Sequence, residues 1–128
     1  MSACPCGSGD GFGTCCGPIV DDGLPARTAE WLMRSRYTAF VLGHTDHLWR
    51  TWHPRTRPPT VEASDVEWTG LTVVEVVAGD EGDDDDGVVE FEARYTGPEG
   101  PTVMRERSLF ERRGGRWTYL TGSDPAGD

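Results

Sequence analysis

The chain has 128 residues, of which 36% are hydrophobic, and a formal net charge of −10 at pH 7. This length and apolar content are sufficient for a domain with its own hydrophobic core. The negative charge repels phosphate backbones and anionic lipid head groups, and no apolar run approaches the ~20 residues of a membrane span, so neither nucleic acid nor a membrane is an expected partner.

Residues 1–25 are rich in glycine and contain all four cysteines of the chain. They have neither helical nor strand periodicity, which predicts a loop-rich knuckle without a core of its own. The N-terminus also lacks the basic region and the apolar run of a signal peptide, so a cytoplasmic protein is expected. Because cytoplasmic thiols are kept reduced, a cysteine cluster there is more typical of a metal site than of disulfides.

Residues 26–128 are expected to form an α+β domain that begins with two helices. Apolar residues at three- and four-residue spacing predict the first helix, with Thr28 as its N-cap and Gly43 at its C-terminal end. A shorter second helix is predicted from about Asp46, and Pro54 ends it.

From Trp68 onward the sequence has the pattern of β-strands, rich in valine and threonine. The predicted strands cover residues 68–79, the strictly alternating segment 89–96, and residues 102–112 and 116–121. Gly114-Gly115 predicts a tight hairpin between the last two strands. The expected architecture is two N-terminal helices on one face of a curved, mainly antiparallel four-stranded sheet.

Cys4 and Cys6 are separated by one residue, and eight residues later Cys15 and Cys16 are adjacent. Four thiolates in this arrangement can close a tetrahedral site around one zinc ion, and a closed shell leaves no position for water, so the ion is expected to be structural. An iron–sulfur cluster, a redox-active dithiol and free thiols are the alternatives. A disulfide between the adjacent pair is disfavoured because its ring is strained.

A candidate pocket follows from the third and fourth strands. The alternation places Glu106 between apolar neighbours on one face, where it needs a charged or hydrogen-bonding partner. Arg57 or His53 could supply that partner as a buried ion pair, or His53 and Glu106 could act together in acid–base chemistry. The ion pair is the favoured interpretation, and no residue is assigned a catalytic role. The candidate pocket residues are Tyr37, Trp52, His53, Arg57, Glu106, Ser108, Trp117 and Tyr119.

Other polar residues are interpreted as surface groups. Arg34 and Arg36 lie off the apolar face of the first helix, where they could pair with strand glutamates or face water. His44 and His47 flank a helix boundary and are expected to be exposed to solvent. The acidic run 79–87 lacks the register of a calcium-binding loop and predicts a solvated hairpin loop.

The N-terminal segment resembles the SEC-C zinc motif of the bacterial preprotein translocase ATPase. The matching residues are Cys4-Pro5-Cys6-Gly7-Ser8-Gly9, Phe12 and Cys15-Cys16-Gly17-Pro18. The rest of the chain resembles the YchJ-like family of bacterial proteins, in Thr28-Ala29-Glu30, Leu32-Met33-Arg34-Ser35-Arg36-Tyr37, Thr51-Trp52-His53-Pro54, Arg57, Glu106-Arg107-Ser108 and Phe110. The resemblance implies a cone-shaped domain of the nuclear transport factor 2-like (NTF2-like) type, in which a curved sheet and helices enclose a pocket.

Two functions are considered. The first is a cytoplasmic zinc-binding accessory or recognition protein, whose knuckle presents a surface to a protein partner. The second is a domain that binds a small molecule in the cone pocket, or an isomerase- or hydrolase-like enzyme that uses His53 and Glu106 there. An open pocket in which polar groups converge would favour the second.

Overall fold

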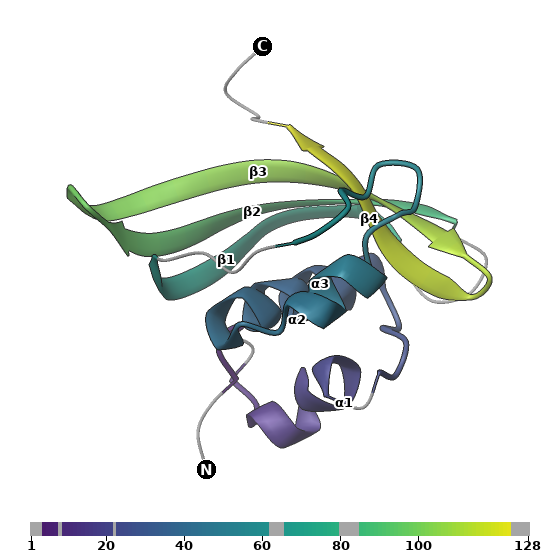
Figure 1. Ribbon diagram of the computed structural model, residues 1–128, viewed down its shortest axis with the longest axis horizontal. Helices are drawn as coiled ribbons and strands as arrows, with labels where there is room; N and C mark the ends of the chain where they lie inside the picture. Colours follow the sequence, from purple (N-terminus) through teal and green to yellow (C-terminus); the bar gives the residue numbers. More distant parts are fainter. Residues whose placement is uncertain (1–3, 8, 22, 62–65, 80–84, 124–128) are drawn as a thin grey trace.

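The computed structural model describes residues 4–7, 9–21, 23–61, 66–79 and 85–123 (Figure 1). Helices α2 and α3 lie on the concave face of a curved sheet, and α1 lies on the side of α2 that faces away from the sheet. In chain order the elements are the 3-10 helix Phe12–Thr14, α1 (Gly17–Val20), α2 (Ala29–Leu42), α3 (Thr45–Arg50), β1 (Glu67–Ala78), β2 (Asp86–Gly97), β3 (Gly100–Arg113) and β4 (Arg116–Ser123). The predicted α+β class is confirmed. None of the helices in these ranges is long and apolar enough to cross a membrane.

Helix α2 begins and ends at the predicted capping residues. Thr28 has an extended backbone, and its side-chain oxygen accepts a hydrogen bond of 3.1 Å from the backbone N–H of Trp31. Gly43 follows the last turn with a φ of 78°, in the left-handed conformation that favours glycine. Local sequence signals therefore set both ends of the helix.

The sheet has the strand order β1-β2-β3-β4, and every neighbouring pair is antiparallel. Gly114 and Gly115 connect β3 to β4 with positive φ values of 56° and 82°, as the predicted tight hairpin requires. Strand β2 begins earlier than predicted, because Asp86 and Gly87 already pair with Glu111 and Phe110 of β3. Residues 80–84 of the acidic run lie outside the described residues.

The two faces of the sheet differ in chemistry. Val89, Ala93 and Phe110 are buried on the face that carries the helices, as the strand alternation predicted. On the other face, the Nε of Arg105 and the Nη1 of Arg107 donate to the carboxylate of Glu90, at 2.7 and 2.9 Å. The partners of this strand glutamate are therefore strand arginines, and not the helix arginines considered from the sequence.

A close approach of backbones holds the start of α2 against the β1–β2 hairpin. The backbone N–H of Ala29 donates to the carbonyl of Gly79 at 3.0 Å. A Cβ atom on Gly79 would lie 2.8 Å from the Cβ of Ala29, and one on Gly87 would lie 2.8 Å from the Cα of Gly79. Both positions therefore need glycine for the helix to approach the sheet this closely.

Helix α3 packs on α2 and encloses His47, which is only 3% exposed. The Nε2 of His47 lies 2.9 Å from the Oγ of Ser35 on α2. The expectation that His47 faces solvent is therefore wrong, whereas the side chain of His44 is 44% exposed. Both histidines lie at a helix boundary, where exposure is expected. The packing of α3 on α2 buries His47 and leaves His44 exposed.

This burial makes the stability of the protein depend on pH. Burial, and next the positive charge of Arg36, lowers the pKa of His47 from 6.5 to about 4. Between these two values the unfolded chain binds a proton that the folded chain does not. The free energy of unfolding should therefore be insensitive to His47 above about pH 6.5 and fall by up to roughly 3 kcal/mol as the pH decreases to 4.

Urea unfolding of wild type and His47→Gln at pH 7, 5.5 and 4.5 measures this contribution. The stability advantage of wild type at pH 7 should shrink at each lower pH. If the free energy of unfolding changed with pH by the same amount in wild type and His47→Gln, His47 would not be the titrating group.

Candidate functional site

The four cysteines form a tight buried cluster. One Sγ atom from each lies within 4.8 Å of the other three, and the Sγ distances are 3.6 Å for Cys6–Cys15 and 3.9 Å for Cys15–Cys16. A tetrahedral zinc ion with Zn–S bonds of ~2.3 Å separates its sulfur ligands by about 3.8 Å. The two Sγ–Sγ distances in the structure are far longer than the ~2.05 Å S–S bond of a disulfide. The cysteine set therefore fits one tetrahedrally coordinated ion.

Backbone turns and helix α2 position the cluster. The backbone N–H of Cys4 donates to the carbonyl of Asp10 at 2.7 Å, and that of Cys15 donates to the carbonyl of Phe12 at 3.1 Å. From α2, the Nη1 of Arg34 donates to the carbonyl of Cys6 at 2.9 Å, and the Oγ1 of Thr38 lies 3.7 Å from the Sγ of Cys4. The knuckle is thus packed directly onto α2.

The surroundings of the sulfur atoms favour the protonated thiol over the charged thiolate unless a cation is present. Cys6 and Cys16 are fully buried. A hydrogen bond with Cys6, and next burial, raises the pKa of the Cys16 thiol. Four thiolates can therefore occupy this cluster together only when a cation compensates their charge, which is the chemistry of a structural metal site.

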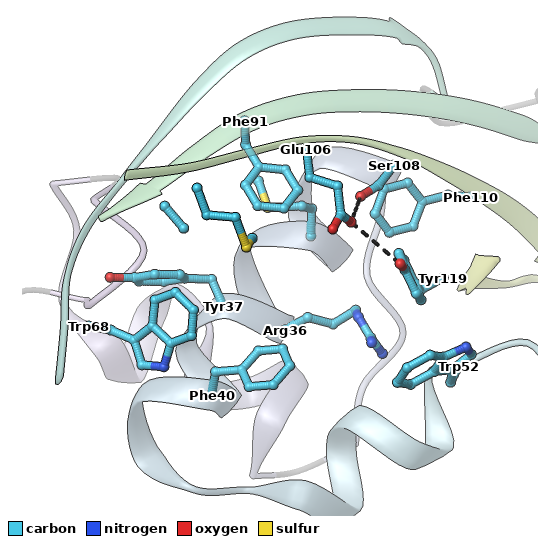
Figure 2. Close-up of a pocket in the computed structure, with 13 residues that line it drawn as sticks. Arg36, Tyr37, Phe40, Trp52, Trp68, Phe91, Glu106, Ser108, Phe110 and Tyr119 are labelled. Atoms are coloured by element: carbon cyan, nitrogen blue, oxygen red, sulfur yellow. Dashed lines mark hydrogen bonds between the residues drawn. The ribbon is translucent and has the colours of Figure 1, made fainter. Parts of the chain in front are cut away.

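A separate cavity of about 260 Å³ lies between α2 and the concave face of the sheet (Figure 2). Five of the eight predicted pocket residues line it: Tyr37, Trp52, Glu106, Ser108 and Tyr119. The other lining residues are Met33, Arg36, Phe40, Trp68, Phe91, Ala93, Met104 and Phe110. This volume is just below the ~300–1,000 Å³ of typical pockets for drug-sized ligands.

Glu106 and its two hydrogen-bond donors form one polar part of the cavity wall. The hydroxyl of Ser108 donates to the Oε2 of Glu106 at 2.6 Å, and the phenol of Tyr119 donates to the same oxygen at 3.4 Å (Figure 2). Burial, and next the charge of Glu106, raises the pKa of Tyr119 to about 12, so the phenol keeps its proton at neutral pH. A Cβ atom on Gly122 would overlap the Glu106 carboxylate, so this glycine provides its space.

Arg36 reaches the same end of the cavity from α2. The prediction that it is a surface group off the apolar face of the helix is therefore wrong. Arg36 is 6% exposed, and its Nη1 donates to the carbonyl of Leu48 and to the Oγ1 of Thr51, both at 2.8 Å. Its guanidinium lies 4.6 Å from the ring centroid of Tyr119 and 5.2 Å from that of Trp52. Burial lowers its pKa to about 10, which leaves Arg36 charged at neutral pH.

A signal for Arg36 was present in the sequence. Met33, Tyr37 and Phe40 follow one another at four- and three-residue spacing, and Arg36 lies three residues after Met33 and four before Phe40. Residues at these spacings share one side of a helix. Arg36 is therefore the charged member of a stripe of helix residues that lines the cavity.

Aromatic rings form the opposite, apolar end of the cavity. The ring of Trp68 lies 5.9 Å from Tyr37 in an edge-to-face arrangement and 5.9 Å from Phe40. Phe91 and Met104 add further apolar side chains to the lining of the cavity from the sheet. The cavity therefore has an apolar end and a polar end.

Three predicted pocket residues lie elsewhere. The Nδ1 of His53 accepts a hydrogen bond of 3.0 Å from the backbone N–H of Arg55, so its Nε2 carries the proton that is donated to Glu111 at 2.9 Å. Arg57 stacks on Trp49, with 3.5 Å from its guanidinium carbon to the ring centroid, and it lines a second cavity together with Trp117. The predicted pairing of Glu106 with His53 or Arg57 is therefore wrong.

Comparisons with known proteins agree with this fold. Residues 28–122 match the family model for the YchJ middle NTF2-like domain, and residues 2–18 match the SEC-C motif. A UPF0225 protein of Chromobacterium violaceum is 47% identical over 126 residues, covering 94% of this chain and 92% of that protein. A UPF0225 protein of Deinococcus radiodurans is 45% identical, covering 94% and 88% of the two chains.

Two solved structures share the architecture. The solution structure of a SEC-C motif containing protein from Rhodopseudomonas palustris superimposes with a TM-score of 0.84 at 32% sequence identity and covers 98% of each chain. The crystal structure of a SEC-C motif containing protein from Psychrobacter arcticus has a TM-score of 0.77 at 27% identity and covers 98% of this chain and 82% of its own. The combination of cysteine knuckle and NTF2-like domain is therefore shared with solved proteins.

Proposed function

This chain belongs to the UPF0225 family, and we propose that it is a cytoplasmic recognition protein in which a structural zinc ion holds the knuckle on α2 and the NTF2-like cavity receives a small molecule. The observation that carries the proposal is the cavity itself, with Arg36 and Glu106 at one end and aromatic rings at the other. Pockets with an apolar wall and a few convergent polar groups are typical ligand sites. A cytoplasmic location fits the four thiols, which stay reduced there.

The zinc ion would be bound by Cys4, Cys6, Cys15 and Cys16 and would supply structural stabilisation. Four sulfur ligands close its coordination shell, and soft thiolates favour zinc among the common divalent ions. None of these cysteines lines the cavity. The metal is therefore assigned to the fold and the cavity to recognition.

Binding is favoured over catalysis because the predicted acid–base pair is not assembled. His53 is bonded to Glu111, and among the described residues neither a histidine nor a cysteine lines the cavity. Ser108 donates a hydrogen bond to Glu106, and among the described residues neither side chain has a histidine partner that could activate it. The arrangement is better suited to holding a ligand than to transforming it.

The zinc proposal is tested with Cys15→Ser. Elemental analysis of wild type should find about one zinc per chain, and the variant should lose it. The free energy of unfolding of the variant should fall by roughly 3 kcal/mol or more, because structural zinc binding contributes on the order of 10–16 kcal/mol in isolated fingers and most of this orders residues 1–25. Residues 26–128 should still melt cooperatively.

The matched control is His44→Gln, which removes an exposed potential ligand that is not part of the sulfur cluster and should retain the zinc. An iron–sulfur absorption band in the purified protein would assign a different metal centre. Absence of any metal together with four reactive thiols would remove the metal site from the proposal.

The cavity proposal is tested by filling the cavity. Ala93 is 1% exposed in its wall, so Ala93→Leu places additional apolar atoms inside. Indole, as a small aromatic probe, should bind wild type in ligand-observed NMR, and the variant should weaken binding at least tenfold. Val103→Leu, at a side chain that is 57% exposed, is the control and should bind like wild type. Equal binding by Ala93→Leu would place the probe elsewhere.

We also propose that the knuckle presents a protein-interaction surface on its outer side. A groove of about 370 Å³ beside Cys15 supports this, with Ile19 and Trp31 in its wall and Leu24 54% exposed at its edge. Apolar side chains at an exposed groove are frequent in protein interfaces. The zinc-bound knuckle would fix the shape of this groove.

A photo-reactive amino acid introduced at Leu24 tests this surface in bacteria. We expect a discrete cross-linked protein at Leu24 that disappears when Cys15→Ser is added. The same label at Val103, on the exposed sheet face, should not give this product. Identical products from both positions, or none from Leu24, would argue against the surface.

A further inference from the structure

The polar end of the cavity contains two opposite charges that do not neutralise each other by direct contact. Arg36 forms no ion pair with a carboxylate among the described residues, and its hydrogen bonds all use Nη1. Both hydrogen bonds to Glu106 reach its Oε2. Within the described part of the chain, the Nε and Nη2 of Arg36 and the Oε1 of Glu106 therefore have no hydrogen-bond partner.

These unused groups face the same end of the cavity from opposite sides. Arg36 approaches from α2 and Glu106 from β3, with Tyr119 beside both (Figure 2). A bound molecule can therefore accept a hydrogen bond from the guanidinium and donate one to the carboxylate at the same time. The arrangement favours a ligand that carries both an acceptor and a donor at one end.

The charge balance of the cavity restricts the ligand further. Arg36 contributes one positive and Glu106 one negative charge, and the remaining lining residues are aromatic, apolar or uncharged at neutral pH. A ligand with a net charge would leave an excess charge in a cavity whose lining is mostly apolar, which is unfavourable. A ligand that is neutral overall keeps the balance.

We propose that the cavity selects flat, apolar molecules that are neutral overall and carry an acceptor–donor pair at one end, such as aromatic amides or lactams. The amide end lies between Arg36 and Glu106, and the ring lies among Tyr37, Phe40 and Trp68. This inference rests on the ligand-binding role proposed for the cavity. It adds the chemical class of the ligand and the two residues that recognise it.

The experiment compares three probes with the same ring and different charge: 2-naphthamide, 2-naphthoate and 2-naphthylmethylammonium. Dissociation constants are measured by calorimetry on the zinc-loaded protein at pH 7. We expect the amide to bind at least tenfold more tightly than either ion. A preference for naphthoate or for the ammonium probe would overturn the inference and leave the ligand-binding proposal standing.

Glu106→Gln tests the role of the carboxylate, because it leaves the cavity with one excess positive charge. The affinity for naphthoate should then increase at least tenfold relative to the affinity for the amide. The control Glu111→Gln changes the partner of His53 outside the cavity lining and should preserve the wild-type order. An unchanged ratio between the naphthoate and amide affinities in Glu106→Gln would exclude Glu106 as the selecting group.

Gly122→Ala gives an independent variant, since a Cβ atom at this position displaces the Glu106 carboxylate and keeps its charge. It should weaken amide binding without favouring naphthoate. If none of the three probes and not even indole binds wild type, the ligand-binding function itself fails. If indole binds and the amide does not, only the proposed recognition by Arg36 and Glu106 fails.

Discussion

The packing of α2 between the cysteine cluster and the curved sheet determines the position of both sites. On one side, Arg34 bonds the carbonyl of Cys6, and Thr38 touches the sulfur of Cys4. On another side, Arg36 and Tyr37 line the cavity. The close approach of Ala29 to the glycines of the β1–β2 hairpin holds the helix in this place. The knuckle and the cavity wall are therefore parts of one packed unit around α2, although they differ in chemistry.

Features that depend on neighbouring residues were predictable from the sequence. Thr28, Gly43 and the Gly114-Gly115 turn each act through their own backbone conformation, so the helix ends and the last hairpin appear where they were expected. The convergence of the four cysteines was predictable because they form two short pairs within one glycine-rich segment. The boundary between residues 1–25 and 26–128 stays a prediction.

Features that depend on how elements dock were not predictable in the same way. His53 and Glu106 both belong to the expected set, yet His53 is directed to Glu111 by the connection after α3. The burial of Arg36 depends on oxygen atoms of Leu48, in the last turn of α3, and of Thr51, the residue after that helix. Strand alternation assigned Trp117 and Tyr119 correctly to one face, but only Tyr119 lies where α2 leaves a cavity.

The hydrogen bonds of Arg36 connect the cavity to the end of α3. Its Nη1 holds the carbonyl of Leu48 and the hydroxyl of Thr51, in the last turn of that helix and at the residue that follows it. A ligand that bonds the unused Nε or Nη2 of Arg36 would share one guanidinium with these two bonds, so under the proposed ligand-binding role occupancy of the cavity and the attachment of α3 would be thermodynamically linked. Linkage is reciprocal. A molecule that bound to α3 and was coupled to the cavity through Arg36 would change the affinity of the cavity by the same factor by which the cavity ligand changes its affinity.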